Sequence, residues 1–500
     1  MSEKTLRIRK FFPFSWRIAW PLFWLLLPLT SFPLISKLMG GATVAPASAI
    51  PLAWLALTWA PWAVWKRKTM PREVIPLVAF VMVALFSSAL AFFGPILSYK
   101  GHTLPRTEFS ALLTLGIGAA YYLIVSGWNR DADDLRHTLR WLNIGGMVLL
   151  AWSLIQTATL LLPSGTYPAI FTKFQHLVST QTLRDPTRIG RITGFTFEPS
   201  WLAHELNLVY LPFWLACTLT GNSAHRIRIW KFSIENLCLA GGVVALLASL
   251  SRVGLAAFGL VVLAGVVLAT QKWSAWLARR AADPARRQKI IHVIMLVVLG
   301  VGFLGGAFAG VKVLSRIDPR LQFVFSLDFS RIQNFFDLAG KLAFAERVAY
   351  WDVGWRTFGQ HPLLGVGLGN SGFYAAGNMS EWGAFLPEIQ RLKYHSGYLL
   401  NVKSFWVRLL SETGLAGFSV FAVWFYLLLR TGWVMRHHRN RLFQTLGLMG
   451  VFVLLAFMLE GFSVDSFAMP YLWVGAGLLS SAAMLARTSS DPPSISQQDE

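Results

Sequence analysis

Apolar residues occur along the chain in long runs, separated by short segments that hold most of the charged residues. A helix needs about 20 apolar residues to cross a bilayer core about 30 Å thick. At that length, the pattern predicts an all-α polytopic integral membrane protein with twelve membrane-spanning helices. The predicted spans are residues 18–39, 43–65, 74–97, 108–127, 139–163, 197–220, 232–250, 253–271, 290–311, 409–429, 442–461 and 466–486.

Composition supports this fold class and excludes several others. The chain is 55% hydrophobic and only 14% charged, whereas soluble globular proteins carry about 25% charged residues. Its 22 Trp and 37 Phe residues exclude disorder or a coiled coil over the whole chain. Two cysteines, Cys217 and Cys238, are too few for a disulfide scaffold or a zinc site built from cysteines.

The net charge of +21 is explained by membrane orientation rather than by nucleic acid as a partner. Lys and Arg concentrate in the cytoplasmic segments of membrane proteins. Alternate segments, counted from the N-terminal one, hold 26 of the 45 Lys and Arg residues, and 11 of the other 19 lie in one long segment, Lys312–Arg408. Long loops cross the membrane largely regardless of charge. Both termini are therefore predicted to be cytoplasmic, and the long segment is predicted to face outward.

The predicted spans and loops divide the chain into five regions, and two helices are predicted in the outer loop. Within the long outer loop, residues 323–344 and 347–358 are expected to form amphipathic helices. The regions are an N-terminal transmembrane bundle (1–180), central transmembrane helices with an outer Arg/Glu motif (181–311), a large outward loop (312–408), C-terminal transmembrane helices (409–487) and a disordered cytoplasmic tail (488–500).

The first candidate site lies at the predicted outer end of the sixth span. Pro199 suits the first turn of a helix, which puts Glu198 at the N-cap. A helix N-terminus favours a bound anion, and Arg184, Arg188 and Arg191 precede it. Guanidinium groups grip phosphate oxygens in pairs, so this cluster is a candidate diphosphate site. The alternative is that these arginines contact lipid headgroups or nearby carboxylates.

Further ionisable residues lie at or near the same membrane face. Glu205 follows Glu198 by two helical turns, and an ionisable group inside a span is a functional candidate. The alternative for Glu205 is a pair with an arginine of a neighbouring helix. We expect His204 to be a structural hydrogen-bonding residue. Arg252, after almost no loop, is expected at the outer membrane edge, where it binds an anion or extends to the lipid headgroups.

The long outer loop adds candidates of three kinds. Arg347, Trp351 and Trp355 recur every four residues, so they share one helix face. His395 is a candidate general base on the outer side. Glu412 and Asp465 lie at membrane entry points, where we expect their carboxylates to pair with arginines and hold the loop. The glycines Gly365, Gly367 and Gly369 allow the backbone to approach a ligand closely.

Taken in order, these motifs resemble the O-antigen ligase and O-antigen polymerase superfamily. No single motif is specific, but the ordered set is. The resemblance is carried by Arg191, Gly194, Glu198–Ser200, Ser251–Arg252, Arg347, Trp351, His361–Gly369 and Glu412–Gly417.

The resemblance implies a C-type glycosyltransferase in a bacterial plasma membrane. Such an enzyme transfers a glycan from a polyprenyl diphosphate to an acceptor hydroxyl, with no cofactor, metal or nucleotide sugar. Its implied partners are the polyprenyl-diphosphate-linked glycan, membrane lipids and other polysaccharide assembly and export proteins. We expect Arg191, Arg252 and Arg347 to bind the diphosphate, and Glu198 or His395 to be the base. The remaining substrate-binding candidates are Arg356 and Lys403.

Three functions remain open, and a polymerase that extends O-antigen or exopolysaccharide is preferred. Ligases of this superfamily usually carry a His-Asn pair at the place that Lys403 and Ser404 occupy here. The Glu-Pro-Ser segment and the spacing between Arg356 and Gly367 resemble polymerases instead. The alternatives are a ligase that transfers the glycan to a lipid or protein acceptor and, in another class, a lipid-linked glycan flippase.

Overall fold

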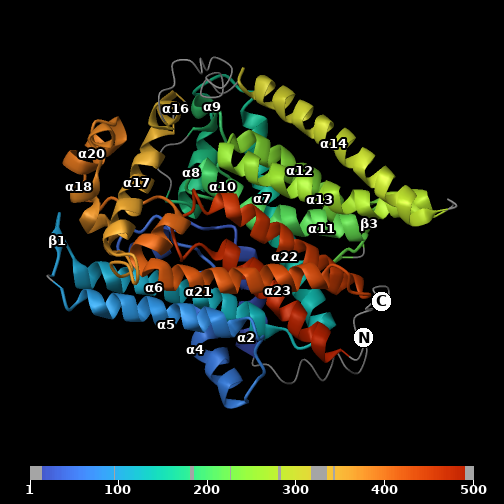
Figure 1. Cartoon of the computed structure of the whole chain (residues 1–500), viewed down its shortest axis with the longest axis horizontal. Coiled ribbons are helices and arrows are strands. Elements are labelled where there is room, and N and C mark those ends of the chain that lie inside the picture. The colour runs from blue at the N-terminus through green and yellow to red at the C-terminus, as the bar shows by residue number, and fades with distance from the viewer. Residues whose placement is uncertain are drawn as a thin grey trace.

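The computed structural model describes residues 14–94, 96–180, 185–225, 227–279, 283–316, 335–341 and 344–489. It is a helical bundle with a cluster of short helices at one end (Figure 1). We call this end, which carries residues 335–404, the loop end. The candidate residue Arg184 and almost all of the predicted C-terminal tail lie outside the described residues.

Helices dominate the structure, which is 74% helical, as the apolar runs predict. Within the described residues, seven helices are long and apolar enough to span a membrane. They are α5 (Val74–Ala91), α6 (Leu104–Trp128), α7 (Ala132–Thr159), α13 (Arg252–Ala278), α14 (Pro284–Leu314), α21 (Phe405–Met435) and α22 (Arg441–Glu460). An all-α polytopic membrane protein is therefore confirmed, while the number of twelve spans stays a prediction.

The remaining bundle helices are shorter or interrupted. The first predicted span is not a single helix, so this prediction is wrong. Residues 27–32 are not helical, and the prolines at 28 and 33 lie at this break. The sixth is one continuous helix with a π-helical turn in its middle. These helices are α2 (Phe14–Leu26), α3 (Pro33–Leu38), α4 (Ala49–Trp65), α10 (Pro199–Glu205), the π-turn η1 (Leu206–Tyr210), α11 (Leu211–Thr220), α12 (Ile234–Ser249) and α23 (Pro470–Thr488).

The loop end contains a small helical unit with its own core of Ala349, Tyr350 and Ile389. The helix predicted at 347–358 is confirmed. The one predicted at 323–344 falls mostly outside the described residues, which include only its last part. The helices of this unit are α16 (Phe335–Lys341), α17 (Ala345–Gln360), η3 (Asn370–Tyr374), α18 (Ala375–Asn378), α19 (Glu381–Ala384) and α20 (Pro387–His395).

Short elements connect the helices. Two antiparallel hairpins are each formed by two strands of two residues. Two further helices precede α10 in the chain. The hairpins are β1 (Ser98–Tyr99) with β2 (His102–Thr103) and β3 (Arg228–Ile229) with β4 (Phe232–Ser233); the helices are α8 (Ala169–Val178) and α9 (Pro186–Ile189).

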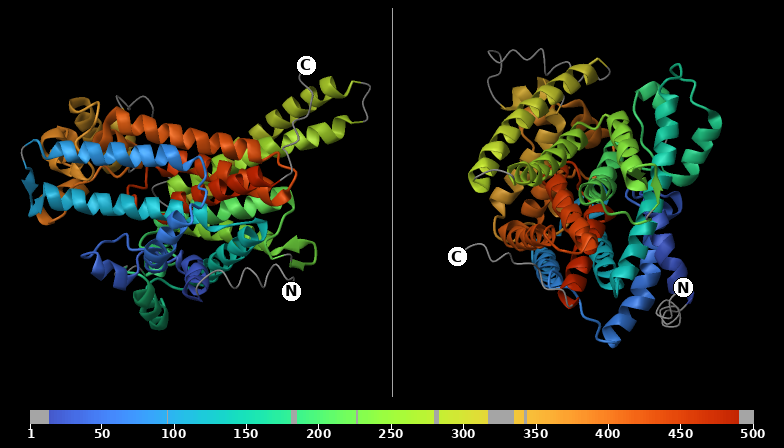
Figure 2. Two further views of the ribbon diagram at one scale, coloured as in Figure 1. Left: turned by 90° about the horizontal axis from the view of Figure 1, so that it is seen from below. Right: turned by 90° about the vertical axis from the view of Figure 1, so that its right-hand side faces the viewer.

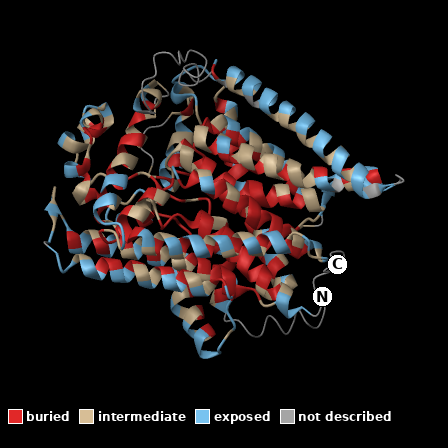
Figure 3. Cartoon of the chain, viewed as in Figure 1, coloured by how far each residue is buried: buried red, intermediate tan, exposed pale blue. Residues whose placement is uncertain are grey.

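Large aromatic side chains fill the centre of the bundle. Trp24, Trp214, Trp424 and Trp473 are almost completely buried, and Figure 3 shows buried residues concentrated where the helices meet. In contrast, α14 packs along α13, and the apolar window of α14 has none of its residues buried. Figure 2 shows this pair projecting from the bundle, which is the exposure expected of a helix that faces lipid.

Candidate active site at the loop end

The segment before α10 is folded into the loop end by two buried glutamines. Gln156 accepts hydrogen bonds through Oε1 from the backbone N–H groups of Thr193 (3.2 Å) and Gly194 (2.8 Å). Gln175 donates through Nε2 to the carbonyl of Gly194 at 3.0 Å. Gly194 has a φ of +57°, and an added Cβ would lie 3.0 Å from Leu202. The residues that precede Glu198 are therefore held in one buried conformation.

Arg191 reaches from this segment to the end of α12. Its Nε donates to the carbonyl of Ser249 at 2.9 Å, and its Nη2 donates to that of Leu250 at 3.3 Å. These carbonyls end a helix, where a positive charge is favourable. The next residues are Ser251, which caps α13, and Arg252. The structure therefore brings Arg191 to the same turn as Arg252.

The start of α10 has the form that the sequence predicts. Glu198 is the N-cap residue in an extended conformation, and Pro199 occupies the first turn. The Glu198 carboxylate is partly exposed, and its described hydrogen bond is one accepted from the Ser200 hydroxyl at 3.2 Å. Glu205, two turns further, is completely buried, and its carboxylate oxygens have no hydrogen-bond partner among the described residues. The expected alternative, an arginine partner for Glu205, is therefore not found there.

A buried polar cluster joins α10 to the end of α22. His204 Nδ1 lies 2.6 Å from Glu460 Oε2, and the expected structural role of His204 is consistent with this contact. Asn207 donates to the other Glu460 oxygen at 2.6 Å and to the carbonyl of Gly254 in α13 at 2.8 Å. Helices α10, α13 and α22 thus meet around these three side chains.

Helix α17 extends to the same end of α22. Trp351 contacts Phe344 on its own helix's N-terminal side and Phe462, two residues after Glu460, with ring centroids 5.2 and 5.4 Å apart. Arg347 lies one turn before Trp351. Its Nη1, and Nε1 of Trp351, are buried and have no hydrogen-bond partner among the described residues. Two N–H donors therefore remain unsatisfied beside the helix end to which α10 and α13 are joined.

The glycine-rich segment packs on protein rather than at an open surface, which corrects the expectation that it approaches a ligand. Gly367 donates to the carbonyl of Glu412 at 3.0 Å. A Cβ on Gly365 would lie 2.4 Å from the Glu412 backbone, and one on Gly369 would lie 2.9 Å from Ala111 in α6. The positive φ values of these glycines serve this contact with a kink in α21 at Gly414, where φ is +62°.

The carboxylates at the loop end largely have the expected structural role. Glu412 accepts from Arg408 Nε at 2.8 Å and from the Ser371 hydroxyl at 2.9 Å, so the predicted arginine pair is found. Asp465 accepts instead from Asn401 at 2.9 Å, and only its backbone carbonyl binds Arg408.

The other candidate residues make their described contacts with residues outside this cluster. Arg356 is exposed and bound to Asp352 at 3.1 Å. Lys403 is 3.7 Å from Glu388, which also accepts from the Tyr350 hydroxyl at 3.0 Å. Burial and the Glu388 carboxylate raise the pKa of Tyr350 above its ordinary value.

His395 is also separate, as the exposed last residue of α20. Neither His395 nor Lys403 has a described contact with Arg191, Glu198 or Arg347.

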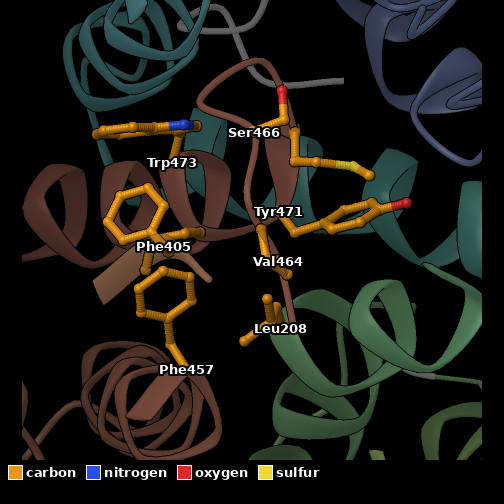
Figure 4. Close-up of a pocket in the computed structure, with 9 residues that line it drawn as sticks. Leu208, Phe405, Phe457, Val464, Ser466, Tyr471 and Trp473 are labelled. Atoms are coloured by element: carbon orange, nitrogen blue, oxygen red, sulfur yellow. The ribbon is translucent and has the colours of Figure 1, made fainter. Parts of the chain in front are cut away.

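A cavity in the bundle interior is unsuited to an anion. Figure 4 shows aromatic and aliphatic side chains around it, among them Phe405, Phe457 and Trp473, with Tyr471 and Ser466 as polar residues. The described lining has no basic side chain. The charged groups of the loop end are therefore the better candidate site.

Comparison with known families agrees with the motifs. A family model described as O-antigen ligase matches residues 237–422. Over this segment the chain is similar to the O-antigen ligase family. The match begins in α12 and ends in α21, so it includes Arg252, Arg347 and the glycine-rich segment but not Arg191 or Glu198. The expected resemblance is confirmed. No curated protein matches the chain.

Sequence reasoning missed the groups that hold the site together. Gln156 and Glu460 were not singled out, although each is a polar residue inside a predicted span. An intramembrane polar residue is rare and pairs with another group, and that signal could have identified both.

Proposed function

We propose that this protein is a membrane glycosyltransferase that moves a glycan from a polyprenyl diphosphate to an acceptor hydroxyl at the loop end. The observation that carries the proposal is the pair of buried, unpartnered N–H donors on Arg347 and Trp351. A buried donor without an acceptor costs about 1–3 kcal/mol. Phosphate oxygens are strong acceptors for such donors, and the family match supports a lipid-linked glycan as the source of the phosphate.

In this proposal the arginines stabilise the leaving group. Arg191 and Arg252, at one turn, and Arg347, on α17, provide the positive charge. The acceptor oxygen forms a bond to the anomeric carbon, and the bond from that carbon to the diphosphate oxygen breaks. The diphosphate leaves with the electron pair, so its charge grows beside these guanidinium groups. The residues need to provide only this clamp and a base.

Glu198 is the base that the geometry favours over His395. It is a partly exposed carboxylate beside the segment that carries Arg191, and its one described partner is a serine hydroxyl. It can take the proton of the acceptor hydroxyl as the new bond forms. His395 lies exposed at the end of α20.

We further propose that the acceptor is a second lipid-linked glycan, which makes the enzyme a polymerase. Lys403, bound to Glu388, stands where ligases of the superfamily usually have a histidine. A ligase is the second candidate, because the matched family is described as O-antigen ligase.

Reconstitution of the purified protein in liposomes with a lipid-linked repeat unit tests these proposals. We expect longer glycans from the unaltered protein and a loss of at least about 100-fold for Glu198→Gln, since general base catalysis contributes about 100- to 10,000-fold. Glu381→Gln, an exposed carboxylate on α19, is the matched control and should retain activity. Full activity of Glu198→Gln would remove Glu198 as base. Transfer to a different acceptor would indicate a ligase, and lipid movement without a new product would indicate a flippase.

A further inference from the structure

The β3–β4 hairpin projects from the end of the bundle opposite the loop end (Figure 1). It connects the end of α11 to the start of α12. Its large apolar side chains lie mostly outside the core, since Trp230 is 93% exposed and both Ile229 and Phe232 are more than half exposed. Adjoining exposed apolar side chains mark a surface that contacts another molecule or a membrane.

The apolar side chains of the hairpin share one face. Ile229 is paired with Phe232 across the two strands, so both side chains project from the same face. Ile227, two residues before Ile229 and also more than half exposed, continues this face. The described part of the chain therefore leaves most of this apolar face uncovered.

The residue at the tip of the hairpin is in an unfavourable conformation. Trp230 is the first residue of the two-residue turn and has a φ of +61°, where Gly is usual. Such a conformation of a bulky residue costs free energy and is typical of functional positions. An indole that is almost completely exposed gains little packing within the chain to offset this cost. We therefore look for its contact outside the chain.

The base of the hairpin is fixed to the membrane helices. The N–H of Ala224 donates to Oε1 of Glu235 at 2.9 Å, and the carbonyl of Ala224 accepts from Nε of Arg140 at 2.9 Å. Glu235 lies in the first turn of α12 and is completely buried, and Ser233 caps the same helix. The hairpin is thus presented at a defined place on the bundle.

A cation–aromatic pair indicates the level of the membrane surface at this end. The Arg436 guanidinium, just after α21, lies 3.5 Å from the ring centroid of Trp433, which is half exposed. Trp and basic residues gather at the level of the lipid headgroups. Thr220, the last residue of α11, is 2.8 Å from Thr445 near the start of α22, the helix that follows α21. The hairpin therefore leaves the bundle close to this level.

Positive charge accompanies the apolar face. Arg228 and Lys231 are exposed, and residues 221–234 contain no acidic residue. Basic residues beside a membrane are attracted to anionic lipids. A free phosphate would pair with these charges but would leave the indole and the isoleucines in water. An anionic phospholipid supplies a phosphate and an apolar chain together, so it matches both features.

We propose that the β3–β4 hairpin is a binding site for an anionic phospholipid. Trp230 and the apolar face enter the boundary between the headgroups and the acyl chains, while Arg228 and Lys231 bind the phosphates. The site is separate from the loop end and does not depend on the proposed function. It applies equally to a polymerase, a ligase or a flippase.

Photocrosslinking of the full-length protein in phosphatidylcholine nanodiscs tests the inference. The probes are a photoreactive phosphatidylglycerol and a photoreactive phosphatidylcholine with the same acyl chains, and the labelled residues are located by peptide mass spectrometry. Labelling of α14, whose apolar window has no buried residue, is the internal reference for general lipid contact. We expect the phosphatidylglycerol probe to label residues 227–233 more strongly, relative to α14, than the phosphatidylcholine probe does.

Three variants separate the contributions. Replacing Arg228 and Lys231 together by Gln should lower hairpin labelling by the anionic probe about fivefold for each charge removed. The charge-matched control replaces Lys173 on α8 and Arg391 on α20, both exposed, by Gln and should leave hairpin labelling unchanged. Trp230→Gly should lower hairpin labelling without lowering the unfolding temperature in neutral detergent, because Gly adopts a positive φ without strain.

Four results would overturn the inference. They are equal hairpin labelling by the two probes, unchanged labelling in the double Gln variant, loss of labelling when soluble glycerol phosphate is added, and labelling of α14 without labelling of the hairpin. The third result would indicate a site for a free phosphate, and the fourth would indicate a water-soluble partner of the hairpin.

Discussion

Two arginines on α17 allow substrate binding to be separated from folding. Arg347 has a buried nitrogen without a partner among the described residues, whereas Arg356 is exposed and paired with Asp352 at 3.1 Å. Replacing each by methionine keeps most of the apolar part of the side chain and removes the charge. If the Arg347 donor is reserved for a phosphate, Arg347→Met should lose activity but not stability.

The magnitudes follow from the contacts of each side chain. An unsatisfied buried donor costs about 1–3 kcal/mol, so its removal should leave stability within about 1 kcal/mol of the unaltered protein or raise it. Loss of a hydrogen bond to a charged phosphate costs about 1.5–3 kcal/mol, which lowers kcat/KM by about tenfold to 100-fold. The exposed pair of Arg356 contributes about 0.3–0.5 kcal/mol, so Arg356→Met should be close to neutral in both respects.

The assay combines thermal unfolding of the purified variants with glycan extension in liposomes at several donor concentrations. We expect Arg347→Met to unfold at the same temperature or higher and to show a raised KM, a lowered kcat, or both. The reasoning is refuted if the unfolding temperature of Arg347→Met is several degrees lower than that of the unaltered protein while kcat/KM is unchanged. It is refuted equally if Arg356→Met loses as much activity as Arg347→Met.

Two further predictions concern the fold. Gly414→Ala should lower the free energy of unfolding by at least about 3 kcal/mol, because the added Cβ would lie 2.4 Å from the Leu363 backbone at a φ of +62°. The control, Gly302→Ala in open space on α14, should leave the free energy of unfolding unchanged or raise it. Thermal unfolding of both variants measures the difference. Burial lowers the pKa of Lys68 from 10.5 to about 8. Between these values the unfolded state binds more protons, so the unaltered protein should gain stability relative to Lys68→Met as pH rises from about 8 to 10.5. A constant difference in unfolding temperature over that range would contradict the Lys68 prediction.

Much of the bundle could be predicted because a membrane helix must satisfy its own backbone and therefore leaves a long apolar run in the sequence. The helices α5, α6, α13 and α22 each coincide with such a run. The first predicted span failed because hydropathy does not register the break near Pro28. Helices of the loop end are short and partly polar; the predicted helices at 347–358 and 323–344 correspond to α17 and include α16, whereas α18, α19 and α20 were not located beforehand.

The candidate site could be predicted in part. The N-cap at Glu198 and the closeness of Arg191 to Arg252 follow from local signals at the ends of predicted spans. The role of the glycines could not be inferred, because their close contacts are with α6 and α21, which are distant in sequence. The contact that Glu460 makes could not be inferred either, because its partner His204 is 256 residues away in the sequence.

The hydrogen bonds between the glycine-rich segment and the kink of α21 restrict where the chain can change in length. Leu415 and Ala416 donate to the carbonyls of Pro362 and Leu363, and Val366 donates to that of Ser411, so one inserted residue would shift every pair. Gly377, by contrast, is exposed with open space around it. Homologous chains should therefore vary in length around Gly377 and keep a constant spacing from Pro362 to Gly369.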